Sequence, residues 1–285
     1  MVRPARPEVA GAPAWPAPAK LNLFLHVTGR RADGYHELQT VFQFLDYGDE
    51  LHFASRRDGV LQRVTRVAGV PDSEDLCLKA ARALKDSTGC ALGCDIRVDK
   101  RIPLGGGLGG GSSDAATTLV ALNRLWHLGL DDEALGAIGA RLGADVPVFV
   151  RGFAAWAEGI GERLTPVLPP EPWYLVVTPP CAVDTRAMYQ DPYLSRATPR
   201  THWADFLVGH THNDFEPVAR RRYPEVGQAL DWAGRYGRAR LSGSGASVFV
   251  AFERREAAEQ VRTQVPTAWR SFVAKGVNRS PLRVA

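Results

Sequence analysis

The sequence predicts an α+β protein of two domains, and three observations lead to this prediction. The chain has 285 residues, more than one hydrophobic core usually holds. Apparent strands and helices alternate in both halves without the regular repeat of a doubly wound sheet. A proline-rich stretch from Pro166 to Pro172 breaks the pattern. We therefore expect an N-terminal extension at 1–14 and domains at 15–166 and 167–285.

The composition excludes several classes of protein. Apolar residues make up 45% and charged residues 23%, which is globular and not disordered, collagen-like or coiled-coil. The net charge is +4, with basic residues spread along the chain, so a nucleic-acid partner is permitted without being indicated. An anionic small substrate fits the same balance. We expect small-molecule partners, no nucleic acid, and a monomer or weak homodimer.

The four cysteines and the apolar runs indicate a compartment. No C-x-x-C pair exists, and four cysteines in this length make neither a zinc site nor a disulfide framework. No apolar run reaches the roughly 20 residues that span a bilayer. The first 14 residues are rich in Pro and Ala and lack the apolar core of a secretory signal. A cytoplasmic protein without a membrane segment or a protein-held metal is expected.

The first element is a strand at 19–27. Its leucines and Val27 alternate with Lys20, Asn22 and His26, which predicts a half-buried strand with polar groups on its second face. The elements expected after it are a turn at Asp33-Gly34, extended chain at 35–45, a helix at 75–84 and a strand at 94–100.

A glycine-rich loop at 105–111 follows, and glycine is poorly suited to regular structure. A helix comes directly after it, with Ser112 or Ser113 as a natural N-cap and apolar residues at helical spacing as far as Trp126. The elements expected beyond it are a helix at 131–142, a strand at 148–150, a strand at 173–178, a helix at 216–235 interrupted at Pro224, a strand–glycine turn–strand at 239–252 and a last helix at 256–264.

The glycine loop predicts a phosphate site. Glycines let the backbone approach a ligand closely, and the helix that follows aims free N–H groups and its positive dipole end at the loop. A triphosphate is the expected ligand, and Ser112 and Ser113 offer hydroxyls to a phosphate or to Mg²⁺. A surface linker is the alternative, but linkers rarely run straight into a capped amphipathic helix.

Other glycine-loop templates fit less well. The P-loop lysine is absent, and no protein-kinase motif appears. Gly105, Gly107 and Gly110 match G-x-G-x-x-G, with Asp131-Asp132 about 20 residues on, as in dinucleotide-binding folds. We reject this interpretation because the preceding strand alternates with charges, residues 101–104 separate it from the glycines, and the aspartate pair opens a helix.

Four further features each have two interpretations. Lys20 is either a solvated strand lysine or catalytic, and Asp145 is either a turn aspartate bonded to local backbone or a functional carboxylate. Tyr35-His36 either belong to a hairpin or contact a ligand. The stretch 242–247 is either a plain hairpin turn or a second set of donors beside the glycine loop.

Together these pieces resemble the GHMP small-molecule kinases. Residues 103–114 look like the phosphate-binding motif of that family, and residues 241–246 look like its third motif. Within the family the chain is most similar to the branch that phosphorylates a cytidine diphosphate ester of methylerythritol in the non-mevalonate isoprenoid route. The resemblance extends from Trp15 to about Phe272, and the stretches that carry it are 18–25, 29–38, 143–150, 157–162 and 213–217.

The resemblance implies a fold and a reaction. The fold is the two-domain GHMP kinase fold, with a ribosomal-protein-like N-terminal domain, a ferredoxin-like C-terminal domain and a cleft between them. The reaction transfers the ATP γ-phosphoryl group to the 2-hydroxyl of the sugar alcohol, with ATP as co-substrate and Mg²⁺ as cofactor.

The resemblance also implies roles for individual residues. Lys20 and Asp145 correspond to the catalytic pair. The substrate contacts correspond to Asn22, Tyr35, His36, Thr185 and Tyr189. The ATP-binding set corresponds to Lys100, near the adenosine, and to Pro103, Leu104, Gly105, Gly106, Gly107, Leu108, Gly109, Gly110, Gly111, Ser112 and Ser113. Asp75 departs from the family, which often has Asn there, and so puts one adenine contact in doubt.

Three competing functions stay open at this point. Another GHMP kinase would act on homoserine, mevalonate or a sugar, although the Tyr35-His36 stretch argues against it. An oxidoreductase would use the G-x-G-x-x-G match. A basic RNA-binding module would bind RNA with a strong salt dependence and would not turn over ATP.

Overall fold

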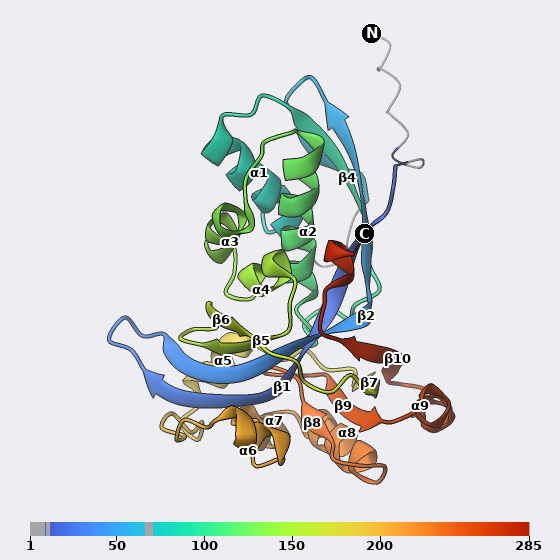
Figure 1. Cartoon of the computed structure of the whole chain (residues 1–285). Helices are drawn as coiled ribbons and strands as arrows, with labels where there is room; N and C mark the ends of the chain where they lie inside the picture. Colours follow the sequence, from blue (N-terminus) through green and yellow to red (C-terminus); the bar gives the residue numbers. More distant parts are fainter. Residues whose placement is uncertain (1–8, 10–11, 66–70, 285) are drawn as a thin grey trace.

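The computed structural model describes residues 9, 12–65 and 71–284 of the chain. In the first half, helices α1 to α4 gather beside the long strands β1, β2 and β4 (Figure 1). The elements of this half are β1 (Trp15–Arg30), β2 (His36–Arg56), β3 (Leu61–Arg63), α1 (Leu76–Thr88), β4 (Gly93–Asp99), α2 (Gly110–Leu125), α3 (Asp132–Ala140), α4 (Val146–Arg151), β5 (Ala155–Glu158) and β6 (Arg163–Pro166).

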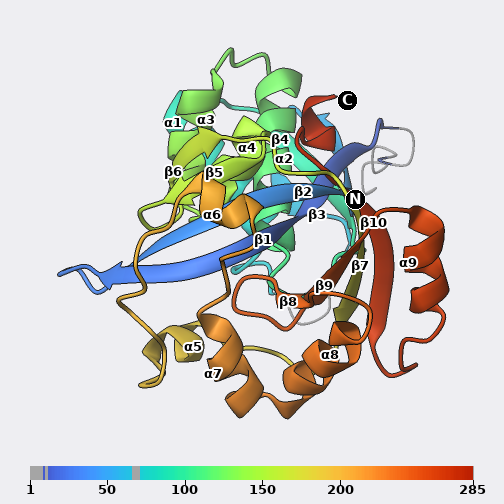
Figure 2. The same ribbon diagram turned by 60° about the horizontal axis from the view of Figure 1, so that its bottom comes forward.

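In the second half, helices α5, α7 and α8 lie below β8 and β9 (Figure 2), and α9 packs against β7 and β10. The elements are β7 (Trp173–Thr178), α5 (Thr185–Gln190), α6 (Trp203–Leu207), α7 (Phe215–Arg222), α8 (Pro224–Gly234), β8 (Arg240–Leu241), β9 (Val248–Phe252), α9 (Arg255–Arg262), β10 (Arg270–Val277) and a 3₁₀ turn at Pro281–Arg283. No helix among the described residues is both long and apolar enough to cross a membrane.

A ten-stranded mixed sheet joins the two halves. Its main path runs β3-β4-β2-β10-β7-β9-β8, and β1 and β5 also pair with β2. β10 is antiparallel to β2 on one side, through Gly276–Leu45 and Val277–Phe44, and to β7 on the other. The expected mixture of strands and helices is therefore confirmed as an α+β fold, and the last long strand of the chain connects its halves.

β1 is buried on both faces, so the expectation of a half-buried strand is wrong. Lys20, Asn22 and His26 are each only 3% exposed. They alternate with apolar residues as predicted, but other parts of the fold cover the polar face. Gly107 of the glycine loop accepts a hydrogen bond from Lys20, and the backbone N–H of His212 lies 3.4 Å from His26 Nε2. Alternation alone does not distinguish a solvated polar face from an enclosed functional one.

The helix after the glycine loop begins earlier than expected. α2 starts at Gly110, and its N-cap is Gly109 in the left-handed region (φ +73°) with no side-chain cap. Ser112 and Ser113 therefore lie in the first turn and do not cap the helix. A side chain at Gly109 would have its Cβ 2.9 Å from the Phe149 ring and 3.1 Å from Lys20 Cε, so close packing as well as backbone conformation favours glycine there.

The expected strand at 148–150 is wrong, because these residues belong to helix α4 (Val146–Arg151). Residues 146–150 are all buried, and a short apolar run that is buried all round does not show by periodicity whether it is strand or helix. Pro147 in the first turn suits a helix start.

The sequence interpretation misses several elements and finds most others. β10 was not expected, although its residues alternate between buried and half-buried or exposed. The short elements β3, β5, β6, α5 and α6 were also missed. The predicted helices at 75–84, 131–142, 216–235 and 256–264 and the predicted strands at 94–100 and 173–178 are confirmed, with ends shifted by a few residues.

Candidate active site

The Lys20 ammonium lies at the centre of a polar cluster under the glycine loop. Its Nζ is 3.2 Å from Asp145 Oδ2 and donates to Asn22 Oδ1 at 2.5 Å and to the Gly107 carbonyl at 3.2 Å. Only 4% of the Lys20 side chain is exposed, against 31% of the Asp145 side chain. Lys20 is therefore not a solvated edge residue, and its buried charge is balanced by a carboxylate at a cavity wall.

Asn22 orients Lys20. Its Oδ1 accepts from Lys20, and its Nδ2 donates to Thr40 Oγ1 at 3.0 Å. The Thr40 hydroxyl in turn donates to the Phe24 carbonyl at 2.5 Å. Since both ends of the Asn22 amide are engaged by the protein, the side chain holds the lysine in place, and its expected contact with substrate stays a prediction.

The Asp145 carboxylate contacts Lys20 across the site and does not bind the backbone next to it in the chain. It occupies the N-cap of α4, but its carboxylate makes no capping bond to that helix. The chain reverses at 143–146, where the Val146 N–H donates to the Gly143 carbonyl. The turn-aspartate interpretation therefore fails, and the carboxylate is left to pair with Lys20.

The two glycine turns pack against one another. The Ser247 N–H donates to the Gly106 carbonyl at 3.1 Å, and Ser242 Oγ donates to the Gly107 carbonyl at 3.0 Å. A Cβ on Gly107 would lie 2.1 Å from the Ser242 carbonyl oxygen. Of the two interpretations of 242–247, the structure supports the one in which this turn lies beside the glycine loop.

A cavity of about 380 Å³, the inner cavity, opens in front of Lys20 and Asp145. It is bounded by both glycine turns, by β1 and by α5. The lining residues are Lys20, Asn22, Leu25, Leu38, Phe42, Gly107, Gly109, Ser112, Ala144, Asp145, Ile160, Gly161, Thr185, Tyr189, Phe215, Gly243 and Ser244.

The residues of the glycine loop contribute mainly backbone to this region. Leu108 is a core side chain, and its carbonyl accepts from the Lys20 N–H at 2.9 Å. Pro103 is also buried, whereas Leu104 is 55% exposed. The Ser113 hydroxyl is fully buried and has no hydrogen-bond partner among the described residues, while Ser112 reaches the inner cavity.

Lys100 lies behind the glycine loop and lines neither of the cavities described here. Its ammonium is 2.5 Å from Asp49 and 2.8 Å from Asp114. Burial raises the pKa of Asp114, against the influence of Lys100. Asp49 also accepts from the N–H groups of Arg101 and Ile102. Lys100 therefore fastens the entry of the loop to α2, and its expected place near the adenosine stays a prediction.

A second and larger cavity of about 740 Å³, the outer cavity, adjoins the first and shares Thr185 and Tyr189 with it. The His36 ring stacks on the Tyr189 ring, with centroids 5.0 Å apart and an interplanar angle of 26°. Thr185 Oγ1 lies 2.8 Å from Ser244 Oγ. The lining residues are Arg30, Asp33, Gly34, Tyr35, His36, Leu38, Ala144, Ile160, Thr185, Arg186, Tyr189, Gln190 and Arg196.

The structure thus brings Tyr35, His36, Thr185 and Tyr189 to one cavity wall, although about 150 residues of chain separate the two pairs. The sequence interpretation missed the arginines of this cavity, Arg30, Arg186 and Arg196. The chain has so many arginines that these three carry no signal of their own, and only the fold brings them together.

Asp75, the departure from the family pattern, has a structural role here. Its carboxylate caps α1 by accepting from the Leu78 N–H at 3.0 Å, and it forms an ion pair with the buried Arg63 side chain. Asp75 is only 2% exposed. These contacts engage both oxygens of its carboxylate with the protein.

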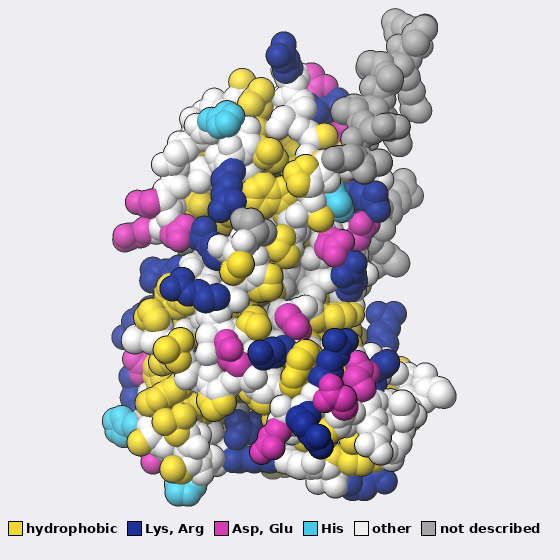
Figure 3. Space-filling model, turned by 45° about the vertical axis from the view of Figure 1, so that its right-hand side comes forward, with side chains coloured by type: hydrophobic (Ala, Val, Ile, Leu, Met, Phe, Trp, Pro, Cys, Tyr) yellow, Lys and Arg dark blue, Asp and Glu magenta, His cyan; other side chains and the backbone are white. Residues whose placement is uncertain are grey.

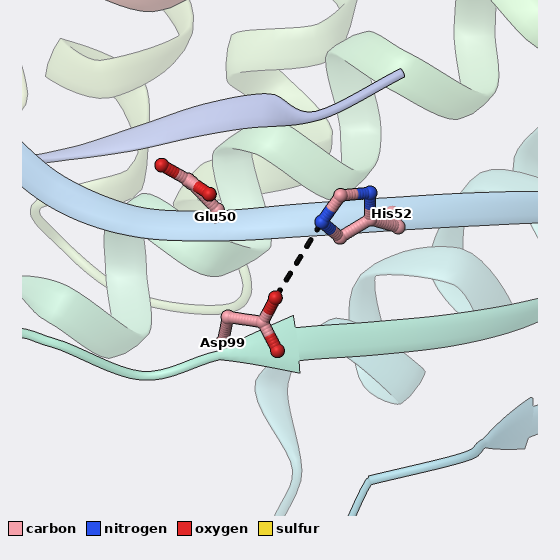
Figure 4. Close-up of side chains that lie close together, drawn as sticks. All are labelled: Glu50, His52 and Asp99. Atoms are coloured by element: carbon pink, nitrogen blue, oxygen red, sulfur yellow. Dashed lines mark ion pairs between the residues drawn. The ribbon is translucent and has the colours of Figure 1, made fainter. Parts of the chain in front are cut away.

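One group of side chains has the composition of a metal site but lies elsewhere. Glu50, His52 and Asp99 come together where β2 and β4 pair (Figure 4), and none of them lines either cavity. Arg101 binds Glu50 at 2.9 Å, and Arg97 binds both oxygens of Asp99. Because arginines already neutralise the carboxylates, this cluster does not assign a metal to the protein.

Comparisons with known proteins agree with this geometry. The family model described as GHMP kinases N terminal domain matches residues 75–153, and the one described as GHMP kinases C terminal matches residues 202–271. The first covers the glycine loop and Asp145, and the second covers the turn beside that loop.

Relatives of known name match over nearly the full chain. A 4-diphosphocytidyl-2-C-methyl-D-erythritol kinase from Pseudomonas paraeruginosa is 56% identical over 267 residues, which cover 94% of this chain and 95% of that one. The protein of the same name from Halorhodospira halophila is 55% identical over 274 residues, covering 95% of both chains.

Solved structures also match the chain. A crystal structure of 4-(cytidine 5'-diphospho)-2C-methyl-D-erythritol kinase matches with a TM-score of 0.81 and 32% identity, covering 93% of this chain and 99% of that one. The Methanococcus jannaschii mevalonate kinase shares the fold, with a TM-score of 0.65 at 16% identity over 95% of this chain and 100% of that one. The chain therefore belongs to the GHMP kinase family.

Proposed function

We propose that this protein transfers the γ-phosphoryl group of ATP to the 2-hydroxyl of 4-diphosphocytidyl-2-C-methyl-D-erythritol, a step of the non-mevalonate isoprenoid precursor pathway. Relatives 55–56% identical along nearly the whole chain carry the name of this kinase. The observation that carries the proposal is the ion pair of Lys20 and Asp145, 3.2 Å apart, at the wall of a cavity that the glycine loop also lines.

The triphosphate lies along the glycine loop in this proposal. Gly105, Gly107 and Gly109 all have positive φ, which turns the backbone sharply before α2 begins. The free N–H groups at the start of α2 and its dipole then attract phosphate oxygens. Lys20 and Ser112 line the same cavity as Asp145. The terminal phosphate of the triphosphate would therefore lie in this cavity, close to Asp145.

Asp145 accepts the proton of the attacking hydroxyl. A tertiary alcohol is a weak acid and must lose its proton as the new phosphorus–oxygen bond forms and the bond to the ADP oxygen breaks. Lys20 adds positive charge beside the attacking oxygen and offsets the charge of the carboxylate. Because the transition state is loose, much of the rate comes from holding the alcohol in line with the γ-phosphorus.

Two side chains at the wall of the inner cavity, Asp145 and Ser112, offer oxygens that suit Mg²⁺. Mg²⁺ prefers oxygen ligands and in kinases is held chiefly by the phosphates of the substrate. The Asp145 carboxylate and the Ser112 hydroxyl supply oxygens at that wall, and the buried Ser113 hydroxyl lacks a partner among the described residues. When bound, Mg²⁺ would neutralise phosphate charge.

The cytidine diphosphate part of the substrate occupies the outer cavity. Tyr35 presents an exposed aromatic ring on which a base can stack, and His36, itself stacked on Tyr189, offers a ring nitrogen for a hydrogen bond. Arg30 and Arg186 bring positive charge to the same cavity, which suits a diphosphate.

The partners proposed are small molecules only. Figure 3 shows lysines and arginines interleaved with aspartates and glutamates on the face it presents, without the continuous basic surface that nucleic acid requires. We also propose a cytoplasmic enzyme, since ATP is supplied there, and a monomer or weak homodimer.

A direct assay tests the proposal. The protein is incubated with Mg-ATP and 4-diphosphocytidyl-2-C-methyl-D-erythritol, and mass spectrometry should detect a product heavier by one phosphate together with ADP. Homoserine, mevalonate and galactose serve as competing acceptors. Phosphorylation of one of these in place of the cytidyl substrate would move the protein to another branch of the family.

A further inference from the structure

Arg196, in the segment after α5, uses its whole guanidinium group to bind protein atoms. Its Nη2 donates to the carbonyls of Tyr189 at 2.9 Å and Asp191 at 2.8 Å, and its Nη1 donates to that of Leu194 at 3.3 Å. Its Nε donates across the outer cavity to His36 Nε2 at 3.2 Å. Arg196 therefore ties the end of α5 to the first residue of β2.

The bond from Arg196 fixes which nitrogen of His36 carries the proton. To accept a hydrogen bond, Nε2 must present a lone pair, so a neutral imidazole carries its single proton on Nδ1. Stacking on Tyr189 holds the plane of the ring. Among the described residues nothing forms a hydrogen bond with His36 Nδ1, although the residue lines the outer cavity. The ring thus offers one N–H donor to a ligand in that cavity.

The surrounding charges keep this ring neutral. Burial lowers the pKa of His36 below its usual value, and Arg196 and Arg30 lower it further. The titratable and charged residues that line the outer cavity with this ring are Arg30, Asp33 and Tyr35 from the hairpin, Arg186 and Tyr189 from α5, and Arg196. Arginines outnumber the single carboxylate here, so protonation of His36 near pH 7 is opposed.

We propose that Arg196 is a positioning residue that presents His36 Nδ1–H to the pyrimidine ring of the substrate and thereby makes the site select cytosine over uracil. The inference rests on the proposed function, because it takes the base to lie in the outer cavity. Cytosine N3 has a lone pair that accepts from Nδ1–H, whereas uracil N3 carries a hydrogen. With uracil, the N–H donor of His36 Nδ1 would meet the N3–H donor of the base, and no hydrogen bond could form.

The expected discrimination follows from the cost of unpaired donors. A donor left without its acceptor on binding weakens affinity by roughly 10- to 100-fold, and a site built around such a hydrogen bond rejects the mismatched analogue accordingly. A site in which the His36 proton lay on Nε2 would not reject uracil for this reason.

The first test measures the tautomer in the wild-type protein. Nitrogen-15 NMR of labelled histidine at pH 7.5 distinguishes Nδ1–H from Nε2–H, and the His36→Gln variant assigns the signals. We expect the Nδ1–H form. A ring with its proton on Nε2 would overturn the inference, and this result depends on no variant at the Arg196 position.

The second test compares the cytidyl substrate with its uridyl analogue, using wild type, Arg196→Gln and the matched control Arg200→Gln. Arg200 is on the same connecting segment but pairs with Glu37 and Glu158 and does not touch His36. We expect wild type and Arg200→Gln to prefer cytidyl by roughly 10- to 100-fold in kcat/KM. In Arg196→Gln the preference should shrink, mainly through a higher KM for the cytidyl substrate.

The outcomes separate the two proposals. Equal use of both substrates by wild type, or an unchanged preference in Arg196→Gln, overturns the role of Arg196 and leaves the kinase assignment intact. Failure of wild type to phosphorylate either substrate contradicts the proposed function itself. If Arg196→Gln does not fold, two wild-type measurements can still overturn the inference: the ratio of kcat/KM for the cytidyl and uridyl substrates, and the tautomer of His36.

Discussion

At the scale of single residues, the chemistry depends on two charges held a short distance apart. Lys20 is almost fully enclosed, with Asn22, Gly107 and Asp145 as partners, so its ammonium can hardly move. Asp145 is more exposed and faces the cavity. This asymmetry suits a fixed cation that stabilises charge and a carboxylate that exchanges a proton with a bound alcohol.

The role of Asp145 can be tested by Asp145→Asn. The amide keeps the shape of the side chain but accepts a proton poorly, so turnover should fall roughly 10²- to 10⁴-fold, while ATP binding measured by calorimetry stays nearly unchanged. The exposed Asp86 provides the matched control, Asp86→Asn. A near-normal rate for Asp145→Asn would remove this residue as the base.

Lys20→Met tests the partner charge. Methionine fills much of the same space without the ammonium, so kcat should fall by roughly 10²- to 10³-fold, with Lys79→Met on the exposed face of α1 as control. The measurement is steady-state kinetics at saturating ATP. An unchanged kcat in Lys20→Met would show that Lys20 has only a structural role.

The sequence alone could suggest these two residues but not their pairing. Lys20 and Asp145 are 125 positions apart, and each has an ordinary structural explanation in its own surroundings. Arg196 gave no signal, because a hydrogen bond between a loop and the start of a distant strand has no local pattern.

At the scale of elements, the site is made where two glycine turns touch. Gly107 and Gly105 both have positive φ, but only Gly107 lies against the neighbouring turn, where a Cβ would be 2.1 Å from the Ser242 carbonyl oxygen. The phosphate loop therefore has a shape that depends on a segment about 135 residues further along the chain.

These two glycines form a matched pair of variants. Alanine at either position has the backbone cost of the left-handed region, about 1–2 kcal/mol. Gly107→Ala must also push the turns apart, so its kcat/KM for ATP should be about 100-fold below that of Gly105→Ala. Equal activities in steady-state assays would show that contact between the turns does not shape the site.

His26 in β1 predicts a pH dependence of stability. Burial lowers its pKa, nearby His212 lowers it further, and Asp214 partly opposes both. Because the folded protein then binds this proton less readily than the unfolded chain, the free energy of unfolding should decrease as the pH falls below about 6.5.

Urea unfolding at pH 7.5 and pH 5.5 measures this effect. His26→Gln should lose less stability between the two pH values than wild type does, whereas His210→Gln, at an exposed position, should behave as wild type. An equal pH dependence in wild type and His26→Gln would show that protonation of His26 does not contribute.

Element types were predictable where a pattern had length and periodicity, and not elsewhere. α1, α2 and α8 were found because apolar residues recur at helical spacing over 11 to 16 residues. α4 was mistaken for a strand because residues 146–150 are all buried, which erases the periodicity. The six-residue α5 and the five-residue α6 are too short to display one.

At the scale of the whole molecule, the C-terminal residues complete the N-terminal half. Val277 of β10 pairs with Phe44 of β2, and the Ser280 N–H donates to the Gly152 carbonyl. Leu282 is fully buried in the same core as α2 and α4. The boundary predicted near Pro166–Pro172 stays a prediction, but a domain ending there would lack these contacts.

Calorimetry tests this dependence. Because β10 pairs with both halves of the sheet, we expect the full chain to unfold in one cooperative transition. A fragment containing residues 15–166 should fail to show cooperative unfolding, whereas one that adds residues 270–283 through a flexible linker should recover part of it. Two separate transitions in the full chain would indicate that the halves fold independently.

The central claim is that the triphosphate lies against the N–H groups that open α2 while Lys20 and Asp145 face the acceptor alcohol. A crystal structure with the cytidyl substrate and a non-hydrolysable ATP analogue tests it most directly. We predict phosphate oxygens on the amides of residues 105–113, the terminal phosphate beside Lys20, and the 2-hydroxyl at hydrogen-bond distance, about 3 Å, from Asp145. A triphosphate bound away from this loop, or an acceptor hydroxyl out of reach of Asp145, would contradict the account.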